Sequence, residues 1–575
     1  MNKSSKKRAK RKPGSNRSDN RENHHIRSSD DGIADKRNGV DCRTKGDNDP
    51  AWYAQSPQLI KDYASLPFGN PLGSQLPNIG NLNVTAIPGV CVLYYAPTIG
   101  VANDPNAAVN VAMRNIYSYV RHENSGSTNY DAPDLMLYLL AMDSVFMFHA
   151  YLKRVLGTLM LYTSYNRYYP QTVIEAMGVK FSDIQAHISD FRGYINQYAV
   201  KIGSMRIPNS MSYMARHTWM AEHLYVDDPS TPKAQTYMYC PSTYFKFELD
   251  SHGAGKLNIV NFLINSVTGK LETLKTFEDL RNFGDSLINP LLANEDFNVM
   301  SGDILKAFGP DGIVTVTGVS ENYIVLPEYS PEVLSQMENA SIMSTVGLGV
   351  TQTTEVGTGY LVSNPTCVVN AHCTEIPQDF PSLAMSSAAA QQLALPYIGN
   401  RIFNMHHQDV TPEEVVVASR LMVCVKREGV SGDYLPPNIT RVLMDVASCG
   451  SEIIESAKIF TFNYRGEVLT TEETPLATSM YSVIGYESDV DRLVRWMVNQ
   501  HDANYEIVSQ FNWHPLIYPA SLVVQRSSQE LAIPPAGLFG DVSNYTTISE
   551  NNIINMNDLA LLSEFTVPIT GLYRN

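Results

Sequence analysis

The densest group of chemically active side chains is a run of cations near the start of the sequence, KKRAKRK at residues 6–12. Lysine and arginine displace the counterions condensed on phosphate groups, which gives an affinity that depends on salt and not on base sequence. No aromatic residue precedes Trp52, so this segment offers no rings on which single-stranded bases could stack. We predict that it binds phosphate groups through Lys3, Lys6, Lys7, Arg8, Lys10, Arg11, Lys12 and Arg17.

The charge of the chain is divided between this segment and the rest. Residues 1–50 hold 14 basic and 8 acidic residues, a net charge of +6. The remaining residues hold 29 basic and 50 acidic residues, a net charge of −21, and the whole chain carries −15. Because an acidic body repels nucleic acid, contact with a polyanion should run through the basic segment. Nuclear import signals have the same composition, and the sequence leaves that use of the run open.

Three short stretches combine residue types that bind metals or catalyse reactions. CVVNAHC (367–373) lacks a second pair of ligands to complete a tetrahedral zinc site, and we interpret it as a strand followed by a turn. MHHQD (405–409) has adjacent histidines, which a strand would point to opposite faces, so we interpret it as a polar loop. RHTWMAEH (216–223) lacks the HExxH spacing of metallopeptidases.

The sequence also contains no GxSxG elbow and no GxxxxGK[ST] phosphate loop. We therefore expect no catalytic residues, no metal, no cofactor and no enzymatic activity. Seven scattered cysteines without disulfide-like spacing, and no apolar signal segment at the N-terminus, predict a reducing compartment.

The elements that carry these residues differ along the chain. Residues 1–50 have only Ile26, Ile33 and Val40 as large aliphatic side chains. Such a segment cannot bury enough apolar surface to offset the entropy of ordering it, so we predict a disordered arm. A flexible chain of about 50 residues typically spans roughly 35–40 Å, which suits a tether.

From about residue 100 to 310 the pattern is mostly helical. Asp104-Pro105 predicts one helix start, and Asp131 with Asp134 predicts another, for a helix that runs to about Tyr165. A short helix is predicted from Ser301 to Phe308. Two stripes, the first of which follows the helix start at Asp104-Pro105, predict amphipathic helices with one buried face. They consist of Val109, Ala112, Ile116 and Val120, and of Ile184, Ile188, Phe191, Ile195, Tyr198 and Ile202 before Gly203.

The stretch LMLYLLAMDSVFMFHAYL (135–152) is almost apolar enough to cross a membrane. Asp143 and His149 interrupt it, and Lys153 and Arg154 follow. A membrane span needs roughly 20 apolar residues with few or no charges. We interpret the stretch as a helix buried in the protein core and expect no membrane span.

After about residue 311 the composition changes. Thr, Val and Gly become frequent, and apolar and polar residues nearly alternate. Residues 312–327 and 344–362 are predicted as strands, and 458–471 as a hairpin that turns near Arg465-Gly466. A helix is predicted at 488–499. The fold class is therefore α+β, with a β-rich part appended to or inserted into an α-rich body.

Three stretches of the α-rich part resemble picobirnavirus capsid proteins: PDLMLYLLAMDS (133–144), NRYYPQTVIEAMG (166–178) and MSGDILKAFG (300–309). The basic N-terminus and the overall length are similar as well. The resemblance is strongest over residues 100–310, and its motifs are structural rather than catalytic.

The resemblance implies a structural protein of the virion. Proteins of this family form two-fold dimers that assemble into a non-enveloped icosahedral shell around double-stranded RNA, in the host cytoplasm. An α-helical shell domain forms the wall, and a projecting domain forms the outer surface. Some members cleave off their own N-terminal segment, and no cleavage site can be matched here. An encapsidated viral polymerase is a further partner that the resemblance allows, and it names no host receptor.

On this basis we predict four parts: a disordered basic arm (1–50), an α-rich shell domain (51–310), a β-rich projecting domain (311–490), and a mixed segment (491–575) that returns to the shell. The arm would package double-stranded RNA without reading its sequence. The alternative is a nucleic-acid-binding scaffold with a nuclear-localising arm that forms no shells. A nucleic-acid-processing enzyme is disfavoured because no catalytic constellation is evident.

Overall fold

The computed structural model describes most of the chain after residue 88. The described ranges are 89–161 (without 125 and 127–129), 169–229, 234–264, 272–353, 359–371, 397–426, 431–435, 439–465, 468–476, 479–484, 508–525, 530–532 and 540–565, with a few isolated residues elsewhere. The predicted arm, its eight phosphate-binding residues and the predicted helix at 488–499 lie outside the described residues.

Residues 1–69 and 70–575 form two compact units. In the first unit, Gln58, Lys61 and Asp62 are helical, and the Gln58 side chain donates a hydrogen bond to the Asp62 carboxylate (2.7 Å). All elements named below belong to the second unit.

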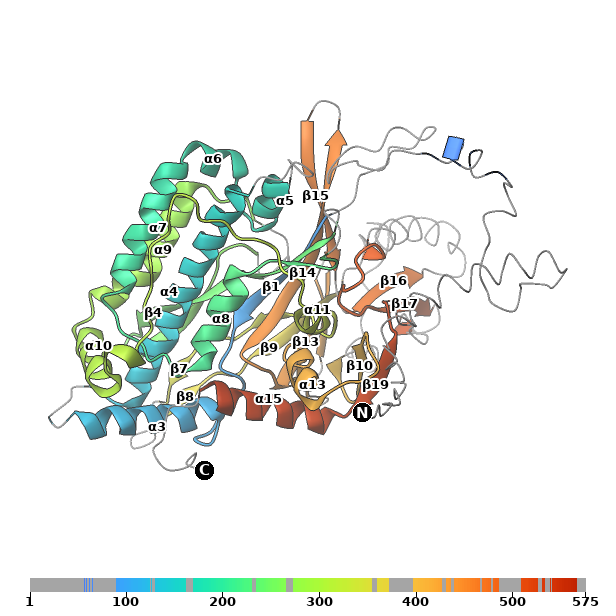
Figure 1. Cartoon of the computed structure of the whole chain (residues 1–575). Helices are drawn as coiled ribbons and strands as arrows, with labels where there is room; N and C mark the ends of the chain where they lie inside the picture. The colour runs from blue at the N-terminus through green and yellow to red at the C-terminus, as the bar shows by residue number, and fades with distance from the viewer. Residues whose placement is uncertain are drawn as a thin grey trace, which may run out of the picture. The chain divides into compact units, whose positions relative to one another are not determined.

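The helices of the second unit are concentrated before residue 340, and Figure 1 shows most of them gathered on one side of the central strands β1 and β14. They are α3 (Ala108–Glu123), α4 (Ala132–Leu159), α5 (Tyr169–Ala176), α6 (Phe181–Ala186), α7 (Ile188–Ile202), α8 (Ser212–Glu222), α9 (Phe277–Leu292), α10 (Glu295–Phe308), the 3-10 turn η3 (Pro310–Gly312), α11 (Pro331–Glu338), α13 (Pro412–Ala418) and α15 (Glu550–Glu564).

The strands form several small sheets, so the predicted α+β class is confirmed. They are β1 (Val90–Pro97), β2 (Tyr225–Val226), β3 (Thr236–Pro241), β4 (Thr243–Leu249), β5 (Gly255–Asn261), β6 (Ser344–Val346), β7 (Thr351–Gln352), β8 (Leu361–Val362), β9 (Thr366–Ala371), β10 (Arg401–Met405), β11 (Cys424–Val425), β12 (Ser431–Leu435), β13 (Ile439–Ser448), β14 (Glu452–Arg465), β15 (Val468–Leu476), β16 (Ser479–Ile484), β17 (Tyr518–Gln525), β18 (Glu530–Ala532) and β19 (Asn544–Ile548).

The central sheet has the order β15-β14-β1-β3-β2 and joins segments that are far apart in the sequence. β1 pairs antiparallel with β14 and parallel with β3, and all eight of its residues are buried. Its sequence VCVLYYAP is accordingly apolar without alternation, as expected of a strand covered on both faces. A second sheet, of order β11-β13-β9-β6 with β12 beside β13, is built from residues after 340.

Helix α4 is the centre of the core. It begins where predicted: the Asp131 side chain accepts from the backbone N–H of Asp134 (3.2 Å). It packs against α3, α7, α8, α9 and β4, so its apolar surface is covered all round. Within the described residues it alone has the length and apolar composition of a membrane span, and that stretch is entirely buried in the protein. The interpretation as a core helix is therefore confirmed.

Several predicted boundaries are correct, and others are shifted. α4 ends at Leu159 rather than near Tyr165. The predicted end was too late because apolar residues continue past the helix, as far as the buried Leu161. The stripe that ends at Gly203 belongs to two helices, α6 and α7, which are separated at His187. α10 begins at Glu295, where Asn294 caps it, and ends before Gly309 as predicted. The first predicted stripe is the buried face of α3.

In the later part of the chain, the hairpin near Arg465-Gly466 is confirmed, since β14 and β15 pair with Arg465 opposite Val468. Residues 344–362 do contain short strands, and the strand in 367–373 is confirmed as β9. Strands β2 to β5 were not foreseen within the helical region.

The predicted strand at 312–327 is wrong. The segment contacts α7 and α4 and contains a turn at Glu321–Asn322, and only isolated bridges at Ile313 and Glu328 pair its ends. Its alternation of apolar and polar residues reflects one buried face, which a helical surface provides as well as a sheet does.

Two glycines inside helices give opposite expectations for the same substitution. A Cβ on Gly284 of α9 would clash with the Tyr194 hydroxyl and lie 2.7 Å from the Phe148 ring, whereas a Cβ on Gly302 of α10 has no atom within 4 Å. We expect Gly284→Ala to destabilise the fold by about 1–3 kcal/mol through overpacking. Gly302→Ala should stabilise it by about 0.5–1 kcal/mol through helix propensity.

Chemical denaturation of the two variants beside the unsubstituted chain measures both effects. Equal free energies of unfolding for the two variants would contradict the packing of α9 against α4 and α7.

Candidate functional site, a buried charge network

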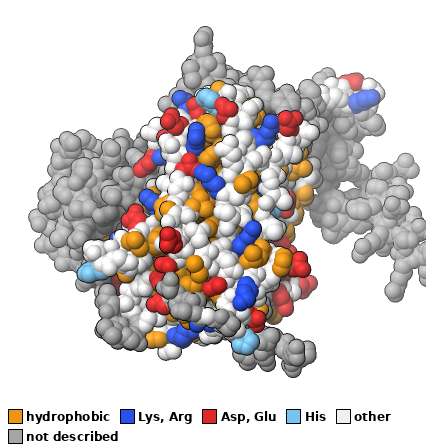
Figure 2. Space-filling model, turned by 90° about the vertical axis from the view of Figure 1, so that its left-hand side faces the viewer, with side chains coloured by type: hydrophobic (Ala, Val, Ile, Leu, Met, Phe, Trp, Pro, Cys, Tyr) orange, Lys and Arg blue, Asp and Glu red, His pale blue; other side chains and the backbone are white. Residues whose placement is uncertain are grey.

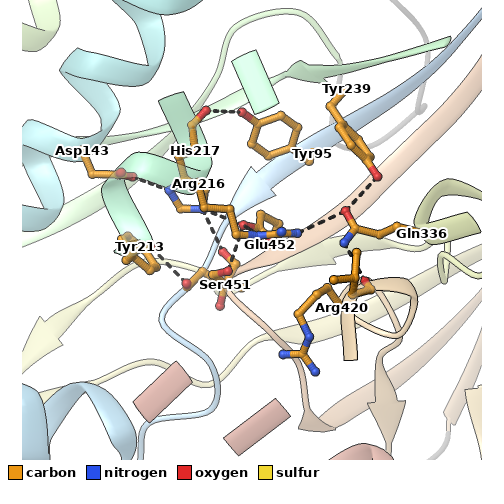
Figure 3. Close-up of polar contacts among 12 residues, drawn as sticks. Tyr95, Asp143, Tyr213, Arg216, His217, Tyr239, Gln336, Arg420, Ser451 and Glu452 are labelled. Carbon is orange, nitrogen blue, oxygen red and sulfur yellow. Dashed lines mark hydrogen bonds and ion pairs between the residues drawn. The ribbon is translucent and has the colours of Figure 1, made fainter. Parts of the chain in front are cut away.

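A group of ionisable side chains inside the protein lies where α4 and α8 meet the start of β14 (Figure 3). Asp143 comes from the middle of α4, Arg216 and His217 from α8, and Glu452 is the first residue of β14. The side chains of Asp143, His217 and Glu452 are fully buried. Burying so many charges is costly unless each is paired, so the geometry of the group decides what it does.

His217 lies between two carboxylates. Its Nδ1 is 2.7 Å from Asp143 Oδ2, and its Nε2 is 3.3 Å from Glu452 Oε1. Arg216 Nε donates to the same Glu452 oxygen at 2.6 Å, and the Ser451 hydroxyl donates to it at 2.8 Å. Two cations are therefore held by two carboxylates across the boundary between the helices and the central sheet.

The pKa values follow from this arrangement. Burial opposes the charged form of His217, but the Asp143 and Glu452 carboxylates raise its pKa to about 10. Burial alone would raise the pKa of Glu452, but Arg216 and His217 hold it well below its usual range. Burial raises the pKa of Asp143, and His217 limits the rise. His217 is thus protonated at neutral pH, and it bridges the two acids as a cation.

The network continues toward α11 and the C-terminal helix. Arg216 Nη2 donates to the Gln336 side-chain oxygen (3.3 Å), which also accepts from the Tyr239 hydroxyl (2.9 Å). The Gln336 amide donates in turn to the carbonyl of Val417 in α13 (2.7 Å). Arg420 follows α13 and donates to the carbonyl of Met556 in α15 (3.2 Å). The side-chain network therefore joins α4, α8, β14, α11 and β3, and Arg420 makes a separate link from the end of α13 to α15.

The geometry does not support catalysis at this site. A protonated His217 cannot act as a general base, and the Ser451 hydroxyl is directed at Glu452 rather than at an imidazole nitrogen. Asp143, His217 and Glu452 are sealed from solvent, and the Arg216 side chain is 16% exposed. Asp143 Oδ1 and Glu452 Oε2 have no hydrogen-bond partner within the described residues, so burying them costs free energy. The network nevertheless holds the elements in one specific arrangement.

A second buried cation fastens the other end of α8. Arg154 of α4 is fully buried, and its Nη1 donates to the carbonyls of Met220 (3.3 Å), His223 (3.2 Å) and Tyr239 (2.6 Å). Met220 and His223 lie at the C-terminal end of α8, where carbonyl groups lack partners and the helix dipole favours a positive charge. Arg154 therefore joins α4, α8 and β3.

The histidines of MHHQD take separate partners. His406 Nε2 is 2.9 Å from the Glu338 carboxylate at the end of α11, and the Trp513 ring lies against its imidazole at 3.9 Å between centroids. His407 Nε2 is 3.3 Å from Glu414 in α13. Residues 406–409 form bends after β10, so the interpretation of this stretch as a polar loop is confirmed.

The described residues offer neither a metal site nor a reactive thiol. No group of three or more His, Cys, Asp or Glu there could hold a metal ion. The five cysteines that the structure describes are buried and free, and burial raises the pKa of each thiol, for example that of Cys240 to about 12. Such thiols are inert as nucleophiles.

Sequence reasoning did not find the Asp143–His217–Glu452 group. Its one visible signal was an acid in the middle of an apolar helix, because a buried charge needs a partner. The partners lie far away along the chain, Arg216 and Glu452 being 236 positions apart, and no local pattern names them.

Comparison with known proteins gives three concordant findings. A family model described as "Picobirnavirus, Capsid protein" matches residues 52–534. The capsid protein precursor of human picobirnavirus is 29% identical over 566 residues, which cover 93% of this chain and 94% of that protein. A solved structure titled "X-ray crystallographic structure of the picobirnavirus capsid" is similar in fold, with a TM-score of 0.71, 20% sequence identity, and coverage of 92% of this chain and all of that chain.

The buried network predicts a large effect of a single substitution. His217→Ala leaves Asp143 and Glu452 buried without their shared cation, so we expect a loss of about 3–5 kcal/mol in the free energy of unfolding. The control His122→Ala removes an exposed histidine beside Glu123 and should cost no more than about 1 kcal/mol. Denaturant unfolding of both variants measures the difference, and equal stabilities would contradict a stabilising role of the network.

The same histidine predicts a pH dependence. The pKa of His217 is raised from 6.5 to about 10 in the folded protein, so its stabilising contribution is complete below pH 6.5 and is lost as the pH rises toward 10. The stability difference between the unsubstituted chain and His217→Gln should therefore shrink between pH 6.5 and 10. Urea unfolding at pH 6, 8 and 9.5 tests this, and a difference that grows with pH would refute a charged His217.

Proposed function

The chain belongs to the picobirnavirus capsid protein family, and on that premise we propose that it is the subunit of a non-enveloped icosahedral shell that packages double-stranded RNA through its basic N-terminal arm. The observation that carries this proposal is the family match over residues 52–534, which extends over both the α-rich and the β-rich parts. The capsid protein precursor that resembles this chain does so over nearly the full length of both. The role of the protein in the virion is structural.

The buried architecture suits a wall that must not deform. Buried ion pairs join α4, α8 and the central sheet, and hydrogen bonds of Gln336 and Arg420 connect α11 and α15 to neighbouring elements. Interiors packed in this way have low compressibility and transmit strain to their neighbours. In the part of the chain that the structure describes, the buried charged side chains hold helices and strands together.

The division of charge supports a separation of roles between arm and body. Figure 2 shows a face of the molecule on which basic and acidic side chains are interspersed, with no predominance of Lys and Arg. We propose that this body with a net charge of −21 leaves the duplex mobile, while the arm with a net charge of +6 attracts it. Many arms in one particle would bind RNA by their number, although each alone binds weakly.

The four parts predicted from the sequence remain proposals. We propose that residues 51–310 form the shell, that 311–490 form the projection, and that 491–575 return to the shell. The contact of α15 with α3 and α8 supports the last of these. In the central sheet β14 pairs with β1 and β15 pairs with β14, so we assign these two strands (452–476) to the shell, as an exception to the projection at 311–490.

We further propose that dimers of this subunit assemble into shells in the host cytoplasm, with an encapsidated polymerase as a further partner. Self-cleavage of the arm has no assigned site in this chain.

Neutralising the arm tests RNA packaging. The variant replaces Lys3, Lys6, Lys7, Arg8, Lys10, Arg11, Lys12 and Arg17 by Gln. We expect particles of the variant to form but to lose most of their nuclease-protected RNA, because the cations that displace phosphate counterions are gone. RNA content per particle, from absorbance after nuclease treatment, is the measurement.

The matched control replaces the same eight positions with the cation of the other type, Lys with Arg and Arg with Lys, and should package normally. Unchanged RNA content in the Gln variant would refute packaging by the arm. If the unsubstituted chain forms soluble monomers and no shells, the capsid proposal itself is wrong, and the alternative of a non-assembling scaffold is favoured.

A further inference from the structure

Four segments that are far apart in the sequence meet at the end of α11, and we call this place the α11 junction. It consists of residues 338–339, 404–406, 513–516 and 540–544. The backbone N–H of Leu516 donates to the carbonyl of Glu338 (3.0 Å), and the Asn404 amide donates to the carbonyl of Asp541 (2.9 Å). The two later segments are thus attached to the two earlier ones.

Asn404 of β10 is the polar centre of the junction. It is fully buried, and its Nδ2 also donates to Glu338 Oε1 (2.9 Å). Its Oδ1 accepts from the backbone N–H groups of Ser543 (3.2 Å) and Asn544 (3.3 Å). Both ends of one buried amide are therefore used to hold residues 540–544 against α11.

The Glu338 side chain brings a carboxylate into this buried place. The side chain is fully buried, and its Oε2 lies 2.9 Å from His406 Nε2. Among the described residues, Glu338 has no ion pair with a lysine or an arginine, so the imidazole supplies its cation. A buried carboxylate without a cation costs free energy. The attachment of the junction to α11 therefore depends on the charge of His406.

His406 can exchange its proton with solvent, in contrast to the sealed His217. Its side chain is 19% exposed, and the Trp513 ring lies against the imidazole at 3.9 Å between centroids. Its second nitrogen, Nδ1, lies 3.9 Å from Asp541 Oδ2. Histidine is the side chain whose ordinary pKa lies nearest to neutral pH. The charge of His406 therefore responds to the pH of the surroundings.

The pKa values at the junction set the direction of this response. Burial opposes the charged form of His406, but its hydrogen bond to Glu338 and the charges of Glu338 and Asp541 raise its pKa above 6.5. Burial raises the pKa of Glu338, and His406 limits the rise. Burial lowers the pKa of the adjacent His514, whose Nδ1 donates to the carbonyl of Pro515 (2.7 Å). The stabilising contribution of His406 is therefore complete below pH 6.5 and is lost as the pH rises through its folded-state pKa.

From this geometry we propose that His406 makes the α11 junction a pH-sensitive attachment. In its protonated form it neutralises Glu338 and holds residues 513–516 and 540–544 against α11. When it loses its proton, Glu338 is left as a buried carboxylate without a cation, and the two segments loosen. The inference goes beyond the proposed function, because it assigns a conformational response to a residue that has no part in RNA packaging.

The response is expected to stay local. β10 pairs with β19 from Arg401 opposite Ile548 to Met405 opposite Asn544, and these backbone hydrogen bonds do not titrate. Phe403, Met405 and Ile548 belong to one buried apolar cluster, which is also independent of pH. β19 and the helix that follows it should therefore remain in place while the loops at 513–516 and 540–544 open.

Hydrogen–deuterium exchange on the unsubstituted chain at pH 6 and pH 8.5 tests the proposal without any variant. After correction for the intrinsic pH dependence of exchange, we expect the protection of the Leu516, Ser543 and Asn544 amides to fall by at least about tenfold at the higher pH. A factor of this size corresponds to the loss of one charged hydrogen bond. Protection that is unchanged or greater at pH 8.5 overturns the proposal.

Two adjacent histidines provide a matched pair of variants. His406→Gln keeps a hydrogen-bond donor but cannot carry a charge, so the three amides should be poorly protected at both pH values. The control His407→Gln removes a histidine that is 44% exposed and pairs with Glu414, and it should respond to pH as the unsubstituted chain does. A pH response that persists in His406→Gln, or that disappears in His407→Gln, contradicts the assignment to His406.

Glu338→Gln removes the carboxylate that requires the cation. We expect the three amides to be protected equally at pH 6 and pH 8.5 in this variant, and a full pH response would overturn the proposed role of the buried carboxylate. Thermal unfolding checks that each variant is folded, and the unsubstituted chain decides the matter if one is not. All of these chains keep His217, so the pH dependence of global unfolding is common to them and cancels in the comparison.

Discussion

The structure depends on the compensation of charges buried around one helix. α4 is covered on every side, yet it carries Asp143 in its middle and Arg154 near its end. Each ion must find its partners inside the protein, because an unpaired charge there would cost several kcal/mol. Asp143 finds them through His217, and Arg154 finds them at carbonyl groups. These requirements determine where α8 and the start of β14 lie, and with them the boundary between helices and sheet.

Sequence reasoning succeeded where the physical signal was local. The start of α4 at Asp131 and the turn after Arg465 could be predicted because a cap and a tight turn depend on a few adjacent residues. The interpretation of α4 as a core helix also followed from local residues, since the polar side chains of Asp143 and His149 argue against a lipid environment.

The failures have a common cause. Alternation in residues 312–327 indicated one buried face, but it could not show whether a sheet or a helical surface covers that face. The His217 network could not be predicted because its members come together only in the folded chain. The parallel pairing of β1 with β3 likewise requires the long helical connection between them. Long-range contacts of this kind are dictated by packing and not by local pattern.

The proposed capsid subunit separates its two tasks physically. The body is acidic and fastened by buried ion pairs, which suits a wall; the arm carries the cations, which suits a soft and salt-sensitive hold on RNA. Contacts with the cargo would thus depend on a segment of the chain separate from the body.

A single-particle reconstruction of assembled particles tests this separation most directly. It is predicted to show a closed icosahedral shell built from the fold of residues 89–565, with the chain before Val90 leading toward the interior and RNA density inside. A reconstruction in which that end of the chain lies on the outer surface, or a preparation that contains no closed shells, would contradict the account.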